Sequence, residues 1–128
     1  MIAGVGTDIV AVARLAKLYE RHGERALDKL LAPAERPDFA KAKDPARFLA
    51  KRFAAKEAFG KALGIGVIAP ATLPNIAIVH NALGKPAFDY APELAAYMAE
   101  RGVLAHLSIS DERDFAVAFV VLEYASIT

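Results

Sequence analysis

The stretch RFLAKRFAAKEAFGKALG, residues 47–64, decides how the chain is organised, because it joins strong helix formers to charges that recur four residues apart. Pro45 stands where the first turn of a helix tolerates proline, and Gly64 stands where a helix ends. We therefore expect one long helix over residues 45–63.

The apolar side chains of this helix do not form a single stripe. At about 100° per residue, Phe48, Phe59 and Leu63 lie on one side. Phe53 lies on another side, and Leu49 lies between them. A helix of this kind is usually covered by several neighbours, from its own chain or from another subunit.

The charges of the helix allow two interpretations. Arg52 and Lys56 share one face, and Glu57 and Lys61 share another. The second pair could be an ordinary surface ion pair, which contributes about 0.2–0.5 kcal/mol. If the helix is buried, each poorly solvated ion costs several kcal/mol, and the charges need a polar ligand. Glu57 and Asp8 would suit Mg²⁺ that binds a substrate phosphate. Arg52, Lys56 and Lys61 would then hold the remaining phosphate oxygens.

The elements on either side of the helix indicate an α+β fold with N-terminal helices and a mainly antiparallel sheet. On the N-terminal side we expect a short strand over 2–5, with Asp8 just past its end, and one or two helices over 13–31 that break at 22–23. On the C-terminal side we expect strands over 75–80, 85–90, 105–110 and 115–123, a helix over 92–101 and a hairpin turn over 111–114. The whole chain, 1–128, is predicted to be a single domain.

Composition narrows the class of protein. The chain has 128 residues, enough for one modest core, and no cysteine, which excludes disulfides and thiolate metal sites. It contains no run of 18 or more apolar residues and no signal-peptide pattern, so we expect a cytoplasmic protein that spans no membrane. The net charge is +1, but residues 1–64 carry +5 and residues 65–128 carry −4. Anionic partners should therefore meet the first half of the chain.

Four motifs together resemble a known family. They are GVGTDIV at residues 4–10, RFAAKEAFGKALG at 52–64, GKP at 84–86 and SIS at 108–110. In order and spacing they are similar to holo-[acyl-carrier-protein] synthase, the short bacterial class of 4'-phosphopantetheinyl transferase. The resemblance covers nearly the whole chain and implies the fold of that family.

The resemblance implies an activity. Such enzymes transfer phosphopantetheine from coenzyme A to a serine of apo acyl carrier protein in fatty acid biosynthesis and release adenosine 3',5'-bisphosphate. Asp8 and Glu57 match the family residues that bind Mg²⁺ together with the coenzyme A pyrophosphate. Lys61 matches a lysine that stabilises or protonates the departing phosphate. The base is either Glu57 or a metal-bound water.

The resemblance also implies a coenzyme A site. The matching residues are Arg52, Lys56, Lys61, Gly64, Gly84, Pro86 and Asp111. For several of them a purely structural interpretation stays open, since residues 84–86 also form an ordinary turn and residues 108–110 an ordinary strand. At 111–112 this chain has Asp-Glu where many members have His-Thr, and it has Ala11 and Ala32 where the family often has Glu and Thr.

A basic stripe on the first helix is the expected docking site for the acidic carrier protein. Its residues are Arg14, Lys17, Arg21 and Arg25, with Leu18 at the border. A solvated charged face is the commoner interpretation of such a stripe, and the resemblance favours docking. The family also implies a homotrimer with active sites between subunits. We weighed two alternatives: a basic module for nucleic acid, disfavoured because no aromatics interleave with the basic residues, and an inactive relative that only binds coenzyme A.

Overall fold

The structure, a computed structural model, describes residues 1–126. Its elements, in chain order, are β1 (Ile2–Ala11), α1 (Val12–His22), α2 (Glu24–Leu30), the 3₁₀ turn η1 (Pro33–Glu35), α3 (Arg36–Lys41), α4 (Pro45–Leu63), the 3₁₀ turn η2 (Leu73–Asn75), β2 (Ile76–His80), β3 (Pro86–Tyr90), α5 (Pro92–Arg101), β4 (Val103–Asp111) and β5 (Phe115–Tyr124). The predicted α+β class is confirmed, with two small antiparallel sheets.

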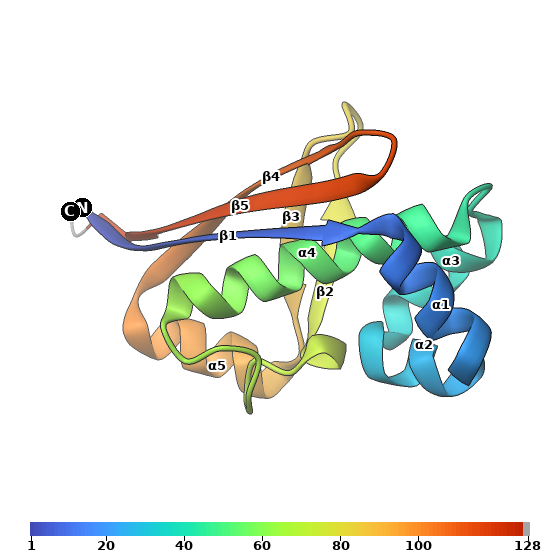
Figure 1. Ribbon diagram of the computed structural model, residues 1–128. Coiled ribbons are helices and arrows are strands. Elements are labelled where there is room, and N and C mark those ends of the chain that lie inside the picture. Colours follow the sequence, from blue (N-terminus) through green and yellow to red (C-terminus); the bar gives the residue numbers. More distant parts are fainter. Residues whose placement is uncertain (127–128) are drawn as a thin grey trace.

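The larger sheet has the strand order β1-β5-β4 and lies over the long helix α4 (Figure 1). Its two strand pairs are antiparallel, and β5 lies between the other two. The hairpin β2–β3 forms the second sheet, and α5 connects it to β4. Strand β1 begins and strand β5 ends at the same end of the molecule, away from α1–α3 (Figure 1).

Helix α4 has the bounds that the sequence predicts. The carboxylate of Asp44 accepts a hydrogen bond from the Arg47 amide at 3.1 Å and caps the first turn. Pro45 lies in that turn, where its missing N–H costs no helix hydrogen bond. Gly64 ends the helix in the left-handed conformation, at φ 83°. These two signals fix the helix to residues 45–63.

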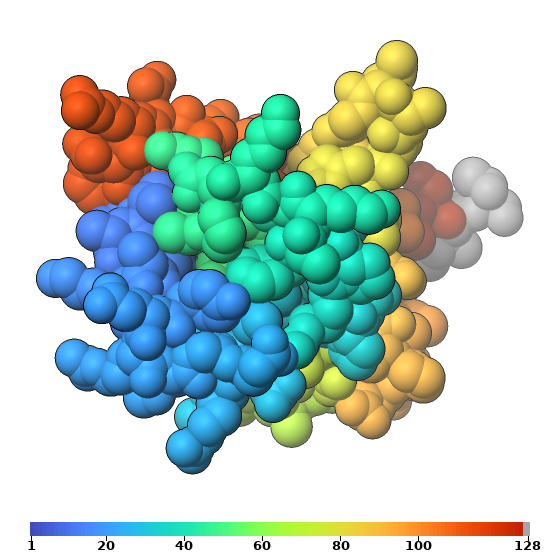
Figure 2. All heavy atoms as spheres, turned by 90° about the vertical axis from the view of Figure 1, so that its right-hand side faces the viewer, coloured from blue at the N-terminus to red at the C-terminus, as the bar shows by residue number. Residues whose placement is uncertain are grey.

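Helix α4 is buried on several sides, and its own chain supplies the cover. It packs against β1, β5 and α1, and Phe59 is fully buried against the rings of Phe88 and Tyr90, with centroids 4.9 and 5.6 Å away. The multi-sided apolar pattern therefore needs no second subunit to explain it. Helices α1–α3 cover much of the face of the molecule that Figure 2 shows.

Strand β1 is longer than predicted. It continues through Asp8 to Ala11, because every residue from Gly4 to Ala11 pairs with β5. The prediction that Asp8 lies past a strand end is wrong. Since side chains alternate along a strand, Asp8 shares the inner face with Gly6 and Val10 and is directed towards α4.

Two glycines of β1 allow the backbone of α4 to come very close. A Cβ atom on Gly4 would stand 2.1 Å from the carbonyl oxygen of Ala62, and one on Gly6 would stand 2.1 Å from that of Ala58. Both helix positions are alanines, the smallest side chain that keeps helix propensity. Small residues on both sides therefore set the distance between β1 and α4.

The remaining predicted elements agree with the structure within a few residues. The break in the first helical region falls at Gly23, whose φ of 55° suits glycine. Strand β4 starts at Val103 and ends at Asp111, two residues earlier and one later than expected. Among residues 1–126, no helix combines the length and the apolar character needed to cross a membrane.

We predict that Gly6→Ala destabilises the fold by about 1–3 kcal/mol, because the added methyl group must push β1 and α4 apart. Urea unfolding followed by circular dichroism measures the loss. Thr7→Ser is the matched control on the next residue; it keeps the hydroxyl that donates to Ala118 O and should change stability by less than about 0.5 kcal/mol. An unchanged unfolding midpoint for Gly6→Ala would contradict the close contact.

Candidate functional site

Three of the predicted catalytic residues come together between β1 and α4. Lys61 Nζ donates to Asp8 Oδ1 at 3.0 Å and to the Thr7 carbonyl oxygen at 3.0 Å. Asp8 is largely covered, with 16% of its side chain exposed, whereas 55% of the Lys61 side chain is exposed. Glu57, one turn before Lys61 on α4, is close enough for the charges of Asp8 and Lys61 to act on it.

Glu57 lies in an environment that disfavours its negative charge. Partial burial is the largest cause and raises the pKa of its carboxyl above the ordinary value, and repulsion from Asp8 raises it further. Lys61 and Arg14 oppose this shift. Two carboxylates that repel each other in a partly buried site are stabilised by a cation placed between them.

The chemistry of this pair fits a hard divalent cation. Asp8 and Glu57 offer carboxylate oxygens, and within residues 1–126 no group of three or more His, Cys, Asp or Glu side chains is placed to hold a metal ion. Mg²⁺ is commonly held by one or two carboxylates, with waters and substrate phosphate filling the other positions. Asp8 and Glu57 are the residues that would hold such an ion.

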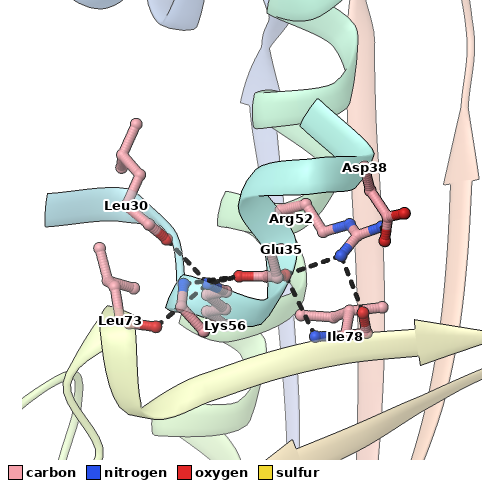
Figure 3. Close-up of polar contacts among 8 residues, drawn as sticks. Leu30, Glu35, Asp38, Arg52, Lys56, Leu73 and Ile78 are labelled. Carbon is pink, nitrogen blue, oxygen red and sulfur yellow. Dashed lines mark hydrogen bonds and ion pairs between the residues drawn. The ribbon is translucent and has the colours of Figure 1, made fainter. Parts of the chain in front are cut away.

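Lys56 has a different role from the predicted phosphate contact. Its side chain is fully buried, and Nζ donates to Glu35 Oε1 at 2.5 Å, to Leu30 O at 2.8 Å and to Leu73 O at 3.1 Å (Figure 3). An ammonium group has three N–H donors, so none remains for a phosphate. Burial lowers the pKa of Lys56 to about 8, and Glu35 acts against that shift.

Arg52 shares the same buried counter-ion. Its guanidinium donates to Glu35 Oε2 at 2.8 Å and to the Ile78 carbonyl oxygen at 2.8 Å, and it lies over the Phe48 ring, 4.4 Å from the centroid. Only 8% of the Arg52 side chain is exposed. A coenzyme A contact through Arg52 is thus restricted to this exposed part.

Glu35 was missed by sequence reasoning, although a signal for it exists. Two cations on one face of a helix whose apolar residues lie on several sides need a buried anion. Glu35 supplies it from the proline-rich segment before α3 and is 1% exposed. Its oxygens also accept from the backbone amides of Ala32 and Ile78, at 2.9 and 3.1 Å.

A basic cavity lies beside the first half of α4. Its volume is about 330 Å³, and its lining includes Lys43, Arg47, Lys51, Arg52 and His80. In Figure 2 the start of α4 lies between the β4–β5 turn and the β2–β3 turn.

Asp111, at the end of β4, joins this group of charges. Arg47 bonds its carboxylate at 3.0 Å, and Lys51 Nζ lies 3.8 Å from it. Arg47 also donates to the carbonyl oxygens of Glu112 and Arg113 at 2.7 and 2.8 Å, so it fixes the β4–β5 turn to α4. The carboxylate of Asp111 therefore neutralises part of the positive charge of Arg47 and Lys51.

The other predicted coenzyme A residues are spread out. Gly64 ends α4 three residues after Lys61. Gly84 lies in the β2–β3 turn with φ 86°, and Pro86 begins β3. Among the described residues, no side-chain hydrogen bond or ion pair joins this turn to Asp8, Glu57 or Lys61.

The basic stripe predicted on the first helix extends over α1 and α2, and all of its members are exposed. Arg14, Lys17, Leu18 and Arg21 line a shallow depression on α1, and Arg25 lies on α2 beside a second one. Arg14 differs from the others, because its guanidinium lies 5.2 Å from the Phe53 ring centroid and its charge acts on Glu57. Arg14 thus belongs to the site around Glu57 as well as to the stripe.

Comparison with known proteins gives consistent matches. Residues 4–120 match the family described as the 4'-phosphopantetheinyl transferase superfamily. The holo-[acyl-carrier-protein] synthase of Dechloromonas aromatica is 62% identical over 98% of this chain and 100% of its own length. The crystal structure of holo-[acyl-carrier-protein] synthase from Neisseria meningitidis superposes with a TM-score of 0.93 at 47% identity and covers 96% of this chain and 99% of its own.

A third relative adds a ligand. The holo-(acyl-carrier-protein) synthase of Bacillus anthracis, described in complex with CoA (3',5'-ADP), has a TM-score of 0.83 at 33% identity and covers 98% of this chain and 99% of its own. The chain therefore belongs to the holo-[acyl-carrier-protein] synthases, a family of 4'-phosphopantetheinyl transferases.

We predict that Glu57→Gln raises the melting temperature at about pH 7 when EDTA is present. The raised pKa means that the Glu57 carboxylate is less favourable in the folded than in the unfolded protein. This penalty appears only as the pH rises above the ordinary pKa that Glu57 has in the unfolded protein. The gain should therefore vanish as the pH falls to about 3, where Glu57 is protonated in both states. Glu100→Gln, at an exposed position of α5, should show no gain. A lower melting temperature for Glu57→Gln at about pH 7 would refute this account.

Proposed function

We propose that the protein transfers 4'-phosphopantetheine from coenzyme A to a serine hydroxyl of apo acyl carrier protein. In this reaction the serine oxygen bonds to the phosphorus of the phosphopantetheine, and the pyrophosphate bond breaks, which releases adenosine 3',5'-bisphosphate. Family membership over nearly the full chain, together with the meeting of Asp8, Glu57 and Lys61 between β1 and α4, carries the proposal. The whole chain, 1–128, would act as one transferase domain.

Asp8 and Glu57 would hold Mg²⁺ together with the pyrophosphate. The ion supplies charge neutralisation of the pyrophosphate when bound. Asp8, largely covered in β1, offers a fixed oxygen donor, and Glu57 offers a second one whose raised pKa also suits proton acceptance. Lys61, which is half exposed, can turn its ammonium from Asp8 towards the departing phosphate.

The basic cavity beside α4 is where we place further phosphate of coenzyme A. Its lining includes Arg47 and Lys51 of α4, the helix that carries Glu57 and Lys61, and Lys43 just before that helix. A phosphate there would compete with Asp111 for Arg47 and Lys51.

The carrier protein would dock on the basic stripe of α1 and α2. Its exposed cations, with Leu18 at the border, suit an acidic partner and would mainly accelerate encounter. Because Arg14 lies close to Glu57, a partner on this stripe is directed towards the carboxylates.

We infer that the protein self-associates through the outer face of the larger sheet. On that face, opposite α4, lie the exposed apolar side chains of Val5, Ile9, Phe115, Val117 and Phe119. An apolar patch of this kind marks a protein–protein interface. The family resemblance implies that the number of subunits is three, in a homotrimer with active sites between subunits. Cytoplasmic location and a role in fatty acid biosynthesis belong to the same proposal.

Incubation with coenzyme A, Mg²⁺ and apo acyl carrier protein should give a phosphopantetheine adduct on the carrier, detected by intact-protein mass spectrometry. Addition of EDTA should prevent the adduct, and Asp8→Asn should prevent it at every Mg²⁺ concentration, because both remove the charge that holds the pyrophosphate in place. Absence of an adduct with several apo carriers would refute the activity.

Lys17→Glu combined with Arg21→Glu should raise the KM for carrier protein roughly tenfold at low salt and leave the KM for coenzyme A unchanged. Both residues lie on the docking stripe and, unlike Arg14, are not among the charges that act on Glu57. The difference should shrink as salt screens the charges. Arg101→Glu, a charge reversal on α5, is the control and should change neither constant. Equal increases in both KM values would show that the stripe is not a separate docking surface.

A further inference from the structure

Helix α4 is held on one side by a buried cluster that the proposed chemistry does not use. We call it the Glu35 clamp: the carboxylate of Glu35 with the side chains of Arg52 and Lys56 (Figure 3). Glu35 lies between the two cations, and each of its oxygens accepts one bond from a cation and one from a backbone amide. Every buried polar side-chain atom in the described part of the chain has a hydrogen-bond partner, so the clamp is fully satisfied.

The clamp fixes α4 to three other segments. Lys56 donates to the carbonyl oxygens of Leu30, the last residue of α2, and of Leu73 in η2. Arg52 and Glu35 bind the carbonyl oxygen and the amide of Ile78, so side chains take the place of a neighbouring strand on β2. Directed hydrogen bonds on one side of a helix restrict its rotation about its own axis.

The clamp and the proposed catalytic groups occupy adjoining sectors of the same helix. At 100° per residue, Arg52 and Lys56 are about 40° apart, and Glu57 and Lys61 follow at about 100° and 140° from Lys56. Ala58 and Ala62, which contact the glycines of β1, come next around the helix. The glycine contact sets the distance of α4 from β1, and the clamp sets its rotation.

We propose that Glu35 is a positioning residue of the transferase: by holding Arg52 and Lys56, it fixes the rotation of α4 that directs Glu57 and Lys61 towards Asp8. A carboxylate at the outer radius of a helix, about 5–6 Å from the axis, moves by about 1 Å when the helix rotates by about 10°. A displacement of about 1 Å in a reacting group can lower turnover by about 10²-fold. This inference rests on the proposed function.

The test uses a charge-matched double variant, Glu35→Gln with Lys56→Met. It removes one negative and one positive charge, so the buried net charge of the cluster is unchanged, and both replacements have nearly the original length. Leu94→Ala is a control that destabilises the protein through α5, whose main contacts are with β3 and β4. Circular dichroism gives the folded fraction of each protein, and the assay temperature is set so that all are folded.

We expect the double variant to lower kcat per folded molecule by about 10- to 100-fold and to change the KM for coenzyme A by less than about threefold. Leu94→Ala should leave both constants at the values of the parent protein. A double variant with the parent kcat, or a control that loses kcat equally, overturns the positioning role.

A second measurement separates this inference from the proposed activity. Without any substrate or metal, ¹⁵N NMR should show shifted amide resonances for Asp8 and Lys61, which are not neighbours of the substituted residues in the chain, in the double variant and unshifted ones in Leu94→Ala. If the parent protein gave no adduct with any carrier but these resonances shifted, the activity would be refuted and the clamp would stand. Unshifted resonances refute the clamp. Should the double variant not fold, Lys56→Met alone, which keeps Glu35 paired with Arg52, replaces it with the same expected direction.

Discussion

The close contact between β1 and α4 is the constraint on which the rest of the structure depends. Gly4 and Gly6 bring the strand against the backbone of Ala62 and Ala58, and no larger side chain fits at either glycine. This contact places Asp8, which shares the inner face of β1, beside residues of α4 that lie one turn apart. The carboxylates that we propose to hold a metal ion are thus brought together by packing of small residues.

The charges of α4 divide into two groups with different surroundings. Arg52 and Lys56 lie in the interior, and one carboxylate with backbone oxygens neutralises and binds them. Glu57 and Lys61 lie at the edge of the core, where burial is incomplete and a ligand can reach them. The same helix therefore carries a buried ionic cluster, which is rigid, and an open one, whose members can exchange partners.

The sequence predicted the fold class and the bounds of α4, because Pro45 and Gly64 mark the two ends of that helix. It also predicted that Asp8, Glu57 and Lys61 belong together. It could not predict the length of β1, since glycines weaken the strand signal and only pairing with β5 extends it to Ala11. Nor could it separate Lys56 from Lys61, because the surroundings of Lys56 depend on Glu35, 21 residues away along the chain, whereas Lys61 binds Asp8.

The glycine–alanine contact has a consequence for how proteins of this kind can diversify. Residues at this interface have no freedom to change size, so a lineage that acquires a new carrier partner has to do so through residues that face outwards. The exposed cations Lys17, Arg21 and Arg25 of α1 and α2 can be replaced one at a time with little effect on the interior. Partner choice can therefore drift between species while the chemistry beneath it stays invariant.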